Sequence, residues 1–328
     1  MRVFVTGGTG HIGSAVVREL VRDGHAVAVL LRPTSQTSSL SGVLSQLTLI
    51  EGDLQNVQCL TPALRQFAPD VTLHLAWFGV TNNLQDDPRQ ISENLAGSLD
   101  LIELSAAVGA GTFVGLGSQA EYGRVDGVLT EDLPLRPLTT YGIVKTAVGS
   151  VGERLAVALG LRFVWLRLLA TYGPFDDPQH LIPFVIDQYL TEQTPELTPG
   201  EQVWDYLYVD DAARAVMSVV LSKQASGVYN LASGTGQTVA SIVTQIRDLV
   251  DPALPLGLGL RAYTANQIMH LQGDISRLSA STGWKPTTSF AAGLDETLAW
   301  HRNRLSVQTQ HGGDQPVASQ GAIHDPTS

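Results

Sequence analysis

The chain has 328 residues, of which 44% are hydrophobic and 16% are charged, and its formal net charge is -11 at pH 7. This composition supports a substantial core and excludes a wholly disordered chain, while the negative charge argues against a nucleic-acid partner bound through a broad basic face. Cys59 is the only cysteine, so no intramolecular disulfide can form. We find no signal-peptide pattern and no apolar run long enough to span a bilayer, and therefore expect a cytoplasmic protein without a membrane partner.

The first half of the chain alternates short apolar runs with helical patterns. The first run leads into a glycine turn, and Gly24 ends the helical pattern that follows. Strands buried on both faces appear as continuous apolar runs, so this alternation predicts a parallel sheet covered by helices on both sides. The predicted strands are residues 2–5, 26–31, 47–52, 71–76, 112–117 and 162–169.

The pattern changes after Tyr172, where prolines and glycines separate shorter segments. We predict an α/β fold: a Rossmann-type doubly wound parallel sheet with a smaller, discontinuous C-terminal substrate domain. From Ser306 onward the sequence has no Lys, Arg, Leu, Phe, Trp or Tyr, which predicts a disordered tail. The predicted parts are residues 1–171 for the dinucleotide-binding domain, with 205–232 returning to it, 172–204 and 233–305 for the substrate domain, and 306–328 for the tail.

A glycine turn lies between the first predicted strand and the first predicted helix. Gly7, Gly10 and Gly13 have the spacing G-x-x-G-x-x-G. Glycine is needed where the chain turns tightly and where backbone approaches a pyrophosphate, and a helix N-terminus offers free N–H groups to phosphates. The alternative is an ordinary tight loop. The candidate cofactor-binding residues of this turn are Gly7, Thr9, Gly10, His11, Ile12 and Gly13.

The end of the second predicted strand bears on the choice of cofactor. An NAD-binding chain usually has Asp or Glu here, whereas this sequence has Leu30, Leu31 and Arg32. An arginine can pair with a 2′-phosphate, so we favour NADP(H), with NAD(H) possible. The alternative is that Arg32 is a solvated loop charge. Asp53, after the third predicted strand, is a candidate partner of the adenine edge or a loop cap.

Three residues form the candidate catalytic group. Tyr141 and Lys145 are spaced i, i+4 and share a face of a helix. We expect the nearby ammonium to lower the tyrosine pKa, which would make Tyr141 a general acid or base. Ser118 ends a predicted strand, where ligands gather in open α/β sheets. A Tyr-x-x-x-Lys pair alone is common on amphipathic helices, so the glycine turn and Ser118 are needed to support this interpretation.

With these landmarks in order, the sequence resembles the extended short-chain dehydrogenase/reductase family, also called the NAD-dependent epimerase/dehydratase family, over about residues 1 to 300. The motifs are TGGTGHIG, GDL at 52–54, HLA at 74–76, Asn94, SQAEYG at 118–123, YGIVK at 141–145, YGP at 172–174, YLYVDD at 206–211 and GWKP at 283–286. The best-known members act on nucleotide sugars. The resemblance implies that Lys145 also bonds the nicotinamide ribose and that Leu54, Leu75 and Ala76 contact the cofactor. It gives Asn94 a structural or cofactor-side role, and a plain surface asparagine is the alternative.

Several positions depart from the family pattern. Gln119 and Ala120 follow Ser118 where members that remove water across C4–C6 have Asp-Glu, and Glu121 is displaced, so we argue against a 4,6-dehydratase. Ala170 and Trp204 stand where family epimerases often have an asparagine and an arginine that contact the substrate diphosphate. The candidate substrate-binding residues are Trp77, Gln119, Ala170, Trp204 and Arg261, with Arg261 a replacement phosphate ligand and Trp77 a wall of the sugar pocket or a core residue.

The first functional hypothesis is an NADPH-dependent reductase of a nucleotide-linked 4-keto-(6-deoxy)sugar, with Tyr141 as proton donor. The alternatives are a nucleotide-sugar 4-epimerase with tightly bound NAD, a reductase of a non-nucleotide carbonyl compound, and a cofactor-sensing regulator without turnover. We expect no metal site. The family pairs helices such as 94–108 and 139–159 across a two-fold axis, so a homodimer is expected, with simple coverage of the sheet as the alternative.

Overall fold

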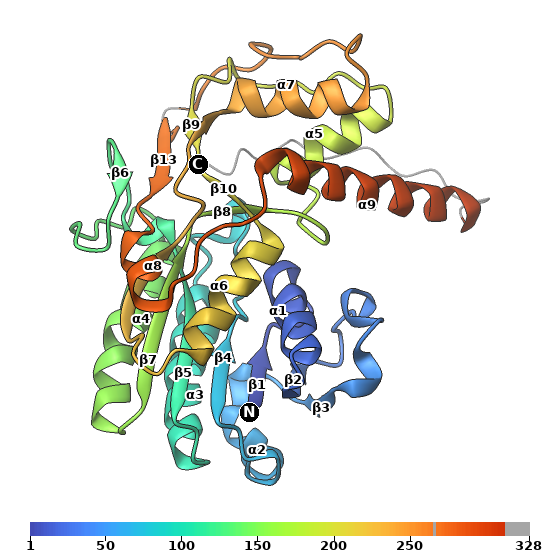
Figure 1. Ribbon diagram of the computed structural model, residues 1–328. Helices are drawn as coiled ribbons and strands as arrows, with labels where there is room; N and C mark the ends of the chain where they lie inside the picture. The colour runs from blue at the N-terminus through green and yellow to red at the C-terminus, as the bar shows by residue number, and fades with distance from the viewer. Residues whose placement is uncertain (265–266, 312–328) are drawn as a thin grey trace.

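The computed structural model describes residues 1–264 and 267–311. Seven strands form one parallel sheet in the spatial order β11–β7–β5–β4–β1–β2–β3 (Figure 1). The order reverses at β1, which defines a doubly wound sheet and confirms the Rossmann-type fold. The strands are β1 (Arg2–Thr6), β2 (Ala26–Leu31), β3 (Thr48–Glu51), β4 (Val71–His74), β5 (Thr112–Ser118), β7 (Arg162–Leu168) and β11 (Gly227–Leu231).

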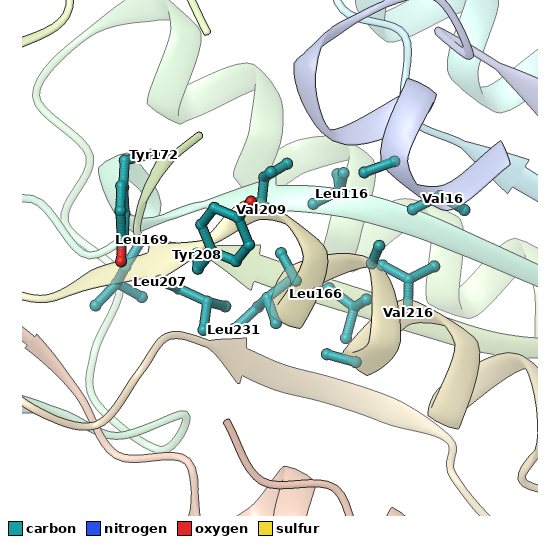
Figure 2. Packing of buried hydrophobic residues seen from close by; sticks show 14 of the residues in the cluster. Val16, Leu116, Leu166, Leu169, Tyr172, Leu207, Tyr208, Val209, Val216 and Leu231 are labelled. Atoms are coloured by element: carbon teal, nitrogen blue, oxygen red, sulfur yellow. The ribbon is translucent and has the colours of Figure 1, made fainter. Parts of the chain in front are cut away.

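Helices cover both faces of this sheet because successive strand residues point to opposite sides. Val3 and Val5 join the buried cluster beneath α1 and α6, whereas Phe4 joins the cluster beneath α3 and α4. Figure 2 shows the first cluster, with Val16 and Val216 of α1 and α6 over strand residues such as Leu166. Each such side chain contributes about 1.5–3 kcal/mol by burial. The helices are α1 (His11–Arg22), α2 (Thr61–Phe67), α3 (Ala96–Ala107), α4 (Thr140–Ala158) and α6 (Val209–Leu221).

A smaller group of elements gathers beyond the carboxyl ends of the large sheet, at the top of Figure 1. It contains a two-stranded sheet, β8–β10, and a four-stranded sheet in the order β12–β9–β13–β6. Strand β6 comes from the first half of the chain and pairs with β13, a pairing that the sequence did not predict. The strands are β6 (Val128–Leu129), β8 (Ala170–Tyr172), β9 (Val203–Trp204), β10 (Tyr206–Tyr208), β12 (Gln237–Thr238) and β13 (His270–Gly273), and the helices are α5 (Leu181–Leu190), α7 (Val239–Val250) and α9 (Phe290–His311). Helix α8 (Ser276–Thr282) packs against β11 of the large sheet instead.

Helix α9 extends beyond the expected start of the disordered tail. The sequence analysis placed that start at Ser306, but the helix continues through His311. Residues 306–311 contain no glycine or proline, so nothing stops the helix before Gly312. That part of the prediction is wrong, and the rest of the predicted tail, 312–328, lies outside the described residues.

Short helical turns connect the larger elements. The turn η6 directly follows β5 and the turn η5, a π-helix, directly precedes α3, and both carry side chains used below. The turns are η1 (Ser38–Leu40), η2 (Leu44–Gln46), η3 (Leu54–Leu60), η4 (Asn82–Leu84), η5 (Gln90–Leu95) and η6 (Gln119–Glu121).

Candidate active site

A cavity of about 980 Å³ opens at the carboxyl edge of the large sheet, where the sheet meets the smaller group of elements. The glycine turn lines one end, and β8, β9 and β10 contribute to the other. Open α/β sheets bind ligands at this edge, next to the point where strand order reverses. The predicted site residues that line the cavity are Gly7, Gly10, His11, Ile12, Gly13, Leu75, Trp77, Ser118, Gln119, Tyr141, Ala170 and Trp204.

The backbone of the glycine turn is packed so closely that side chains at Gly7 and Gly13 would not fit. The backbone N–H groups of the turn therefore stay accessible to a ligand. Gly7 has φ +72°, a conformation that favours glycine. Its carbonyl oxygen accepts a hydrogen bond from the N–H of Gly10 at 3.1 Å. A Cβ on Gly13 would overlap the carbonyl oxygen of Gly7. Helix α1 begins after Gly10 without any side-chain cap, so N–H groups of its first turn remain for a ligand. The turn therefore fits the pyrophosphate of a dinucleotide.

The segment after β2 packs against this turn. Ser39 Oγ donates to the carbonyl oxygen of Thr9 at 2.9 Å, and Arg18 donates to the carbonyl oxygen of Ser39 at 2.9 Å. Arg32 begins this segment; it is exposed, and its backbone N–H bonds Ser35 Oγ at 3.0 Å. No acid occurs between Leu31 and Leu40. Arg32 thus lies on the segment that flanks the glycine turn, outside the cavity lining.

Other predicted cofactor residues have clear structural contacts. Asp53 accepts the N–H of Gln55 at 2.9 Å and caps the turn η3, as the loop-cap alternative expected. Leu54 packs beneath α3, where its carbonyl leaves no room for a Cβ on Gly97. Ala76 leaves no room for a Cβ on Gly7. Arg261 does not line the cavity, and its backbone N–H bonds the carbonyl oxygen of Leu197 at 3.0 Å.

Ser118 and Tyr141 line the cavity, whereas Lys145, one turn along α4 from Tyr141, is buried and does not line it. Ser118 ends β5, Thr139 caps the start of α4, and the N–H of Tyr141 donates to the carbonyl oxygen of Gln85 at 2.7 Å. The Ser118 side chain lies near enough to the Tyr141 hydroxyl to lower the pKa of that phenol. Lys145 Nζ donates to the carbonyl oxygen of Leu116 at 2.6 Å. A phenol and a hydroxyl therefore face a ligand-sized space, with a buried amine one helical turn away.

The electrostatics of Tyr141 differ from the sequence expectation. Burial raises the pKa of Tyr141 to about 12, the hydrogen bond from Ser118 lowers it, and the charge of Glu121 raises it further. Burial also lowers the pKa of Lys145 to about 7. The predicted lowering of the Tyr141 pKa by Lys145 is wrong in this structure, because loss of hydration on burial dominates and the Lys145 amine is directed toward the carbonyl oxygen of Leu116. Tyr141 is thus protonated at neutral pH.

Glu121 is removed from the cavity by a buried network. Its Oε1 accepts the N–H of Ser118 and the indole N–H of Trp165, both at 2.9 Å. Its Oε2 accepts Nε of Arg167 at 2.8 Å, and the two side chains are 1% and 7% exposed. Gln119 and Ala120 line the cavity instead. No carboxylate from this turn faces the cavity, because the Glu121 side chain is turned into this network.

A second buried network surrounds Asn94, on the π-helical turn η5. The Asn94 amide accepts the N–H of Phe78 at 2.8 Å and donates to the carbonyl oxygen of Phe78 at 3.0 Å. It also donates to Oε1 of Gln90 at 2.8 Å. Asn94 thus fixes the backbone that follows β4, which is the structural alternative for this residue, and it is not a surface asparagine. Sequence reasoning missed Gln90, because a π-helical turn leaves no periodic signal.

Polar residues of the segment after β8 also face the cavity and were not predicted. Asp176 is buried and pairs with Nδ1 of His180 at 2.8 Å. The ring of His11 donates from Nδ1 to the carbonyl oxygen of Pro174 at 2.9 Å, which ties this segment to the glycine turn. In the sequence this segment was recognised only by its prolines and glycines, which do not predict a contact with the glycine turn. Within residues 1–264 and 267–311, no group of three or more His, Cys, Asp or Glu side chains is arranged to hold a metal ion.

The fold and this cavity together define an NAD(P)-dependent oxidoreductase of the short-chain dehydrogenase type. The model of the NAD dependent epimerase/dehydratase family matches residues 3–232, and the chain belongs to this family. This confirms the resemblance drawn from the motifs. In the part of the chain that the structure describes, no helix is both long and apolar enough to cross a membrane.

Comparisons with individual proteins agree with this family. A dTDP-glucose 4,6-dehydratase of Salmonella typhimurium is 26% identical over 92% of this chain and 92% of the relative. The crystal structure of the UDP-glucose 4-epimerase of Thermotoga maritima with UDP-glucose is 26% identical, covers 93% of this chain and 100% of that chain, and has a TM-score of 0.84. The UDP-glucose 4-epimerase of Thermus thermophilus in complex with NAD is 28% identical, covers 92% and 99%, and has a TM-score of 0.81.

Proposed function

We propose that the protein is an NADPH-dependent reductase of a nucleotide-linked 4-keto-(6-deoxy)sugar. The observation that carries the proposal is the Ser118–Tyr141 hydroxyl pair beside a cavity whose neighbouring positions, Gln119 and Ala120, have no carboxylate. Elimination of water needs an acid and a base at the substrate, whereas reduction of a ketone needs one proton donor and a hydride. The site has the parts that reduction requires.

Each residue of the site has a distinct role in this reaction. Reduced nicotinamide, when bound, supplies the hydride to the carbonyl carbon. Tyr141 gives its proton to the oxygen of that carbonyl, and Ser118 orients the same oxygen through its hydroxyl. A pKa of about 12 keeps Tyr141 protonated before the reaction, which suits a proton donor. Lys145 would bond the nicotinamide ribose, as the family resemblance implies, from a buried position against Leu116 that does not line the cavity.

Arg32 supports NADPH as the electron donor. The segment from Arg32 to Leu40 flanks the glycine turn and offers a guanidinium and no carboxylate. Arg32→Ala should weaken NADPH binding by roughly 10- to 100-fold, because a charge-assisted bond to phosphate is worth about 1.5–3 kcal/mol. NADH binding should change little, and Arg65→Ala, an exposed arginine on α2, is the control. Equal loss of NADH and NADPH would contradict the 2′-phosphate argument.

A nucleotide-sugar 4-epimerase with bound NAD is the second candidate. The similarity to UDP-glucose 4-epimerases, one of them solved with NAD, favours it. The purified protein should be supplied with a 4-keto-6-deoxy sugar nucleotide and NADPH, and separately with UDP-glucose. Stoichiometric consumption of NADPH supports the reductase, whereas UDP-galactose formed without added cofactor supports the epimerase.

The same preparation tests the remaining alternatives. Thermal stabilisation should be measured with NADPH, NADH, UDP and TDP. Stabilisation by a dinucleotide but by no nucleoside diphosphate would support a non-nucleotide carbonyl substrate. Binding of a dinucleotide without turnover of any carbonyl compound would support a regulator.

We also propose a cytoplasmic homodimer. Helix α4 leaves Ile143, Val151 and Val157 exposed, with Val157 72% exposed, and paired helices would cover these side chains. Light scattering should give a dimer mass, and Val157→Glu should shift it to the monomer. A monomer at all concentrations would contradict the dimer.

A further inference from the structure

The ammonium of Lys145 lies on the face of an indole. Lys145 Nζ is 3.5 Å from the centre of the Trp77 ring, and the lysine side chain is buried, with 4% of the residue exposed. The same indole meets the Tyr141 ring edge to face, with ring centres 6.0 Å apart. Trp77 therefore contacts both ionisable members of the catalytic group.

The indole is held in this position by hydrogen bonds of its own. Trp77 Nε1 donates to Oε1 of Gln90 at 3.0 Å. Gln90 is fully buried, and its Nε2 donates to the carbonyl oxygens of Gly79 at 2.6 Å and Leu84 at 3.0 Å. Every polar atom of the Gln90 amide is thus used to fix the indole and the backbone around it. A tryptophan that only filled space would not need this network of hydrogen bonds to fix its orientation.

We propose that Trp77 is a positioning residue that keeps Lys145 charged and holds its ammonium at the active site. The proposal rests on the oxidoreductase function and is independent of which carbonyl compound is reduced. A desolvated ammonium over the face of a tryptophan is attracted by the ring quadrupole, whereas the neutral amine is not. The attraction therefore favours the protonated form.

The surroundings of Lys145 show why such help matters. Burial lowers its pKa to about 7, and the charge of Glu121, from the turn η6, is what opposes the loss of the proton. Tyr141, one turn away on α4, is neutral, and its ring centre is 5.8 Å from Nζ. His74 of β4 is also neutral, because burial and then the charge of Lys145 lower its pKa to about 3. Glu121 is committed to Arg167, so the groups in direct contact that favour the ammonium are the carbonyl oxygen of Leu116 at 2.6 Å and the face of Trp77, and of these two only the Trp77 side chain can be removed by substitution.

The composition of the chain makes a direct measurement possible. The sequence contains three lysines, Lys145, Lys223 and Lys285, and the latter two are exposed. Protein grown with lysine labelled with ¹³C at Cε should give one signal for each, and a pH titration should give each midpoint. Lys223 and Lys285 serve as internal references, and Lys145→Met identifies the third signal.

Two substitutions separate the ring face from simple bulk. Trp77→Leu removes the quadrupole and should lower the Lys145 midpoint by roughly half a unit to one and a half units, while Trp77→Phe keeps an aromatic face and should lower it less. Trp284→Phe, a buried tryptophan that does not line the cavity, should leave it unchanged. An unchanged or raised midpoint in Trp77→Leu, in protein with unaltered thermal unfolding, would overturn the proposal. If Trp77→Leu does not fold, the result for Trp77→Phe decides, and an unchanged midpoint overturns the proposal.

The same variants give a second readout in turnover. The alkaline limb of the kcat profile should move to lower pH in Trp77→Leu by the shift found for Lys145, and less in Trp77→Phe. A uniform loss of kcat with an unmoved limb would mean that Trp77 merely fills space. Failure of the wild-type protein to turn over any carbonyl compound would count against the proposed function, whereas the lysine titration tests Trp77 regardless.

Discussion

Replacement of Glu121 by glutamine tests the buried network that holds Ser118. The substitution keeps the size of the side chain and an oxygen that can accept from Ser118 N and Trp165 Nε1. It removes the charge that faces Arg167, whose other side-chain partners are the neutral hydroxyl of Tyr122 at 3.1 Å and the carbonyl oxygen of Glu131 at 3.3 Å. Arg167 would then be a buried cation without a counter-charge.

The magnitude follows from the burial of both partners, which are 1% and 7% exposed. Loss of one partner of a buried pair costs about 3–5 kcal/mol, because the remaining charge stays desolvated. Glu121→Gln should lower the free energy of unfolding in urea by that amount. Glu121→Gln together with Arg167→Met should recover part of it, since the stranded charge is gone. Asp132→Asn, at the exposed pair with Arg277, should cost about 1 kcal/mol or less.

A loss in Glu121→Gln no larger than that of the Asp132 control would refute this reasoning. So would a double variant whose loss equals the sum of the two single losses, because the two side chains would then be energetically independent.

Three further predictions concern the site and the sheet. Gly13→Ala should abolish dinucleotide binding measured by calorimetry, because its Cβ would overlap the Gly7 carbonyl oxygen, whereas Gly24→Ala, where a Cβ meets nothing, should retain binding. Tyr141→Phe should lower kcat by about 10²- to 10⁴-fold in carbonyl reduction while NADPH still binds, and retained turnover would exclude Tyr141 as the proton donor. His74 has a folded-state pKa of about 3 against 6.5 when unfolded, from burial first and then the charge of Lys145. In the unfolded protein this histidine takes up a proton that it cannot take up in the folded protein. The free energy of unfolding present above pH 6.5 therefore falls as the pH falls toward 3, by roughly 2 kcal/mol at about pH 5. Urea denaturation near neutral pH and at about pH 5 should show this loss, and His74→Gln should reduce it.

Periodic features of the sequence predicted the fold and the two ends of the cavity. Apolar runs predict the parallel strands, and the glycine spacing predicts a turn whose backbone has no room for side chains. Both features depend on residues that are close in the sequence. Ser118 and Tyr141 could be placed because each stands at a defined end of a strand or helix.

Long-range contacts could not be predicted in the same way. Two of the side-chain partners of Glu121, Trp165 and Arg167, lie on β7, more than forty positions along the chain, and no local pattern links them. The contact of Lys145 with Trp77 depends on the hydrogen bond between Trp77 and Gln90, and a π-helical turn positions Gln90 for that bond. The pKa of Tyr141 was predicted in the wrong direction because the neighbouring charge was considered without the burial of both groups.

The place of β11 in the large sheet has a consequence for synthesis of the protein. β11 forms the edge of the sheet beside β7, and β6 pairs with β13. In both pairs the first strand is synthesised well before its partner. A nascent chain that has emerged only to Tyr172 would expose the apolar edge of β7 with its backbone hydrogen bonds unmade. The ribosome must therefore release residue 231 before this edge is covered, and the growing chain is most exposed to aggregation or chaperone capture during that interval.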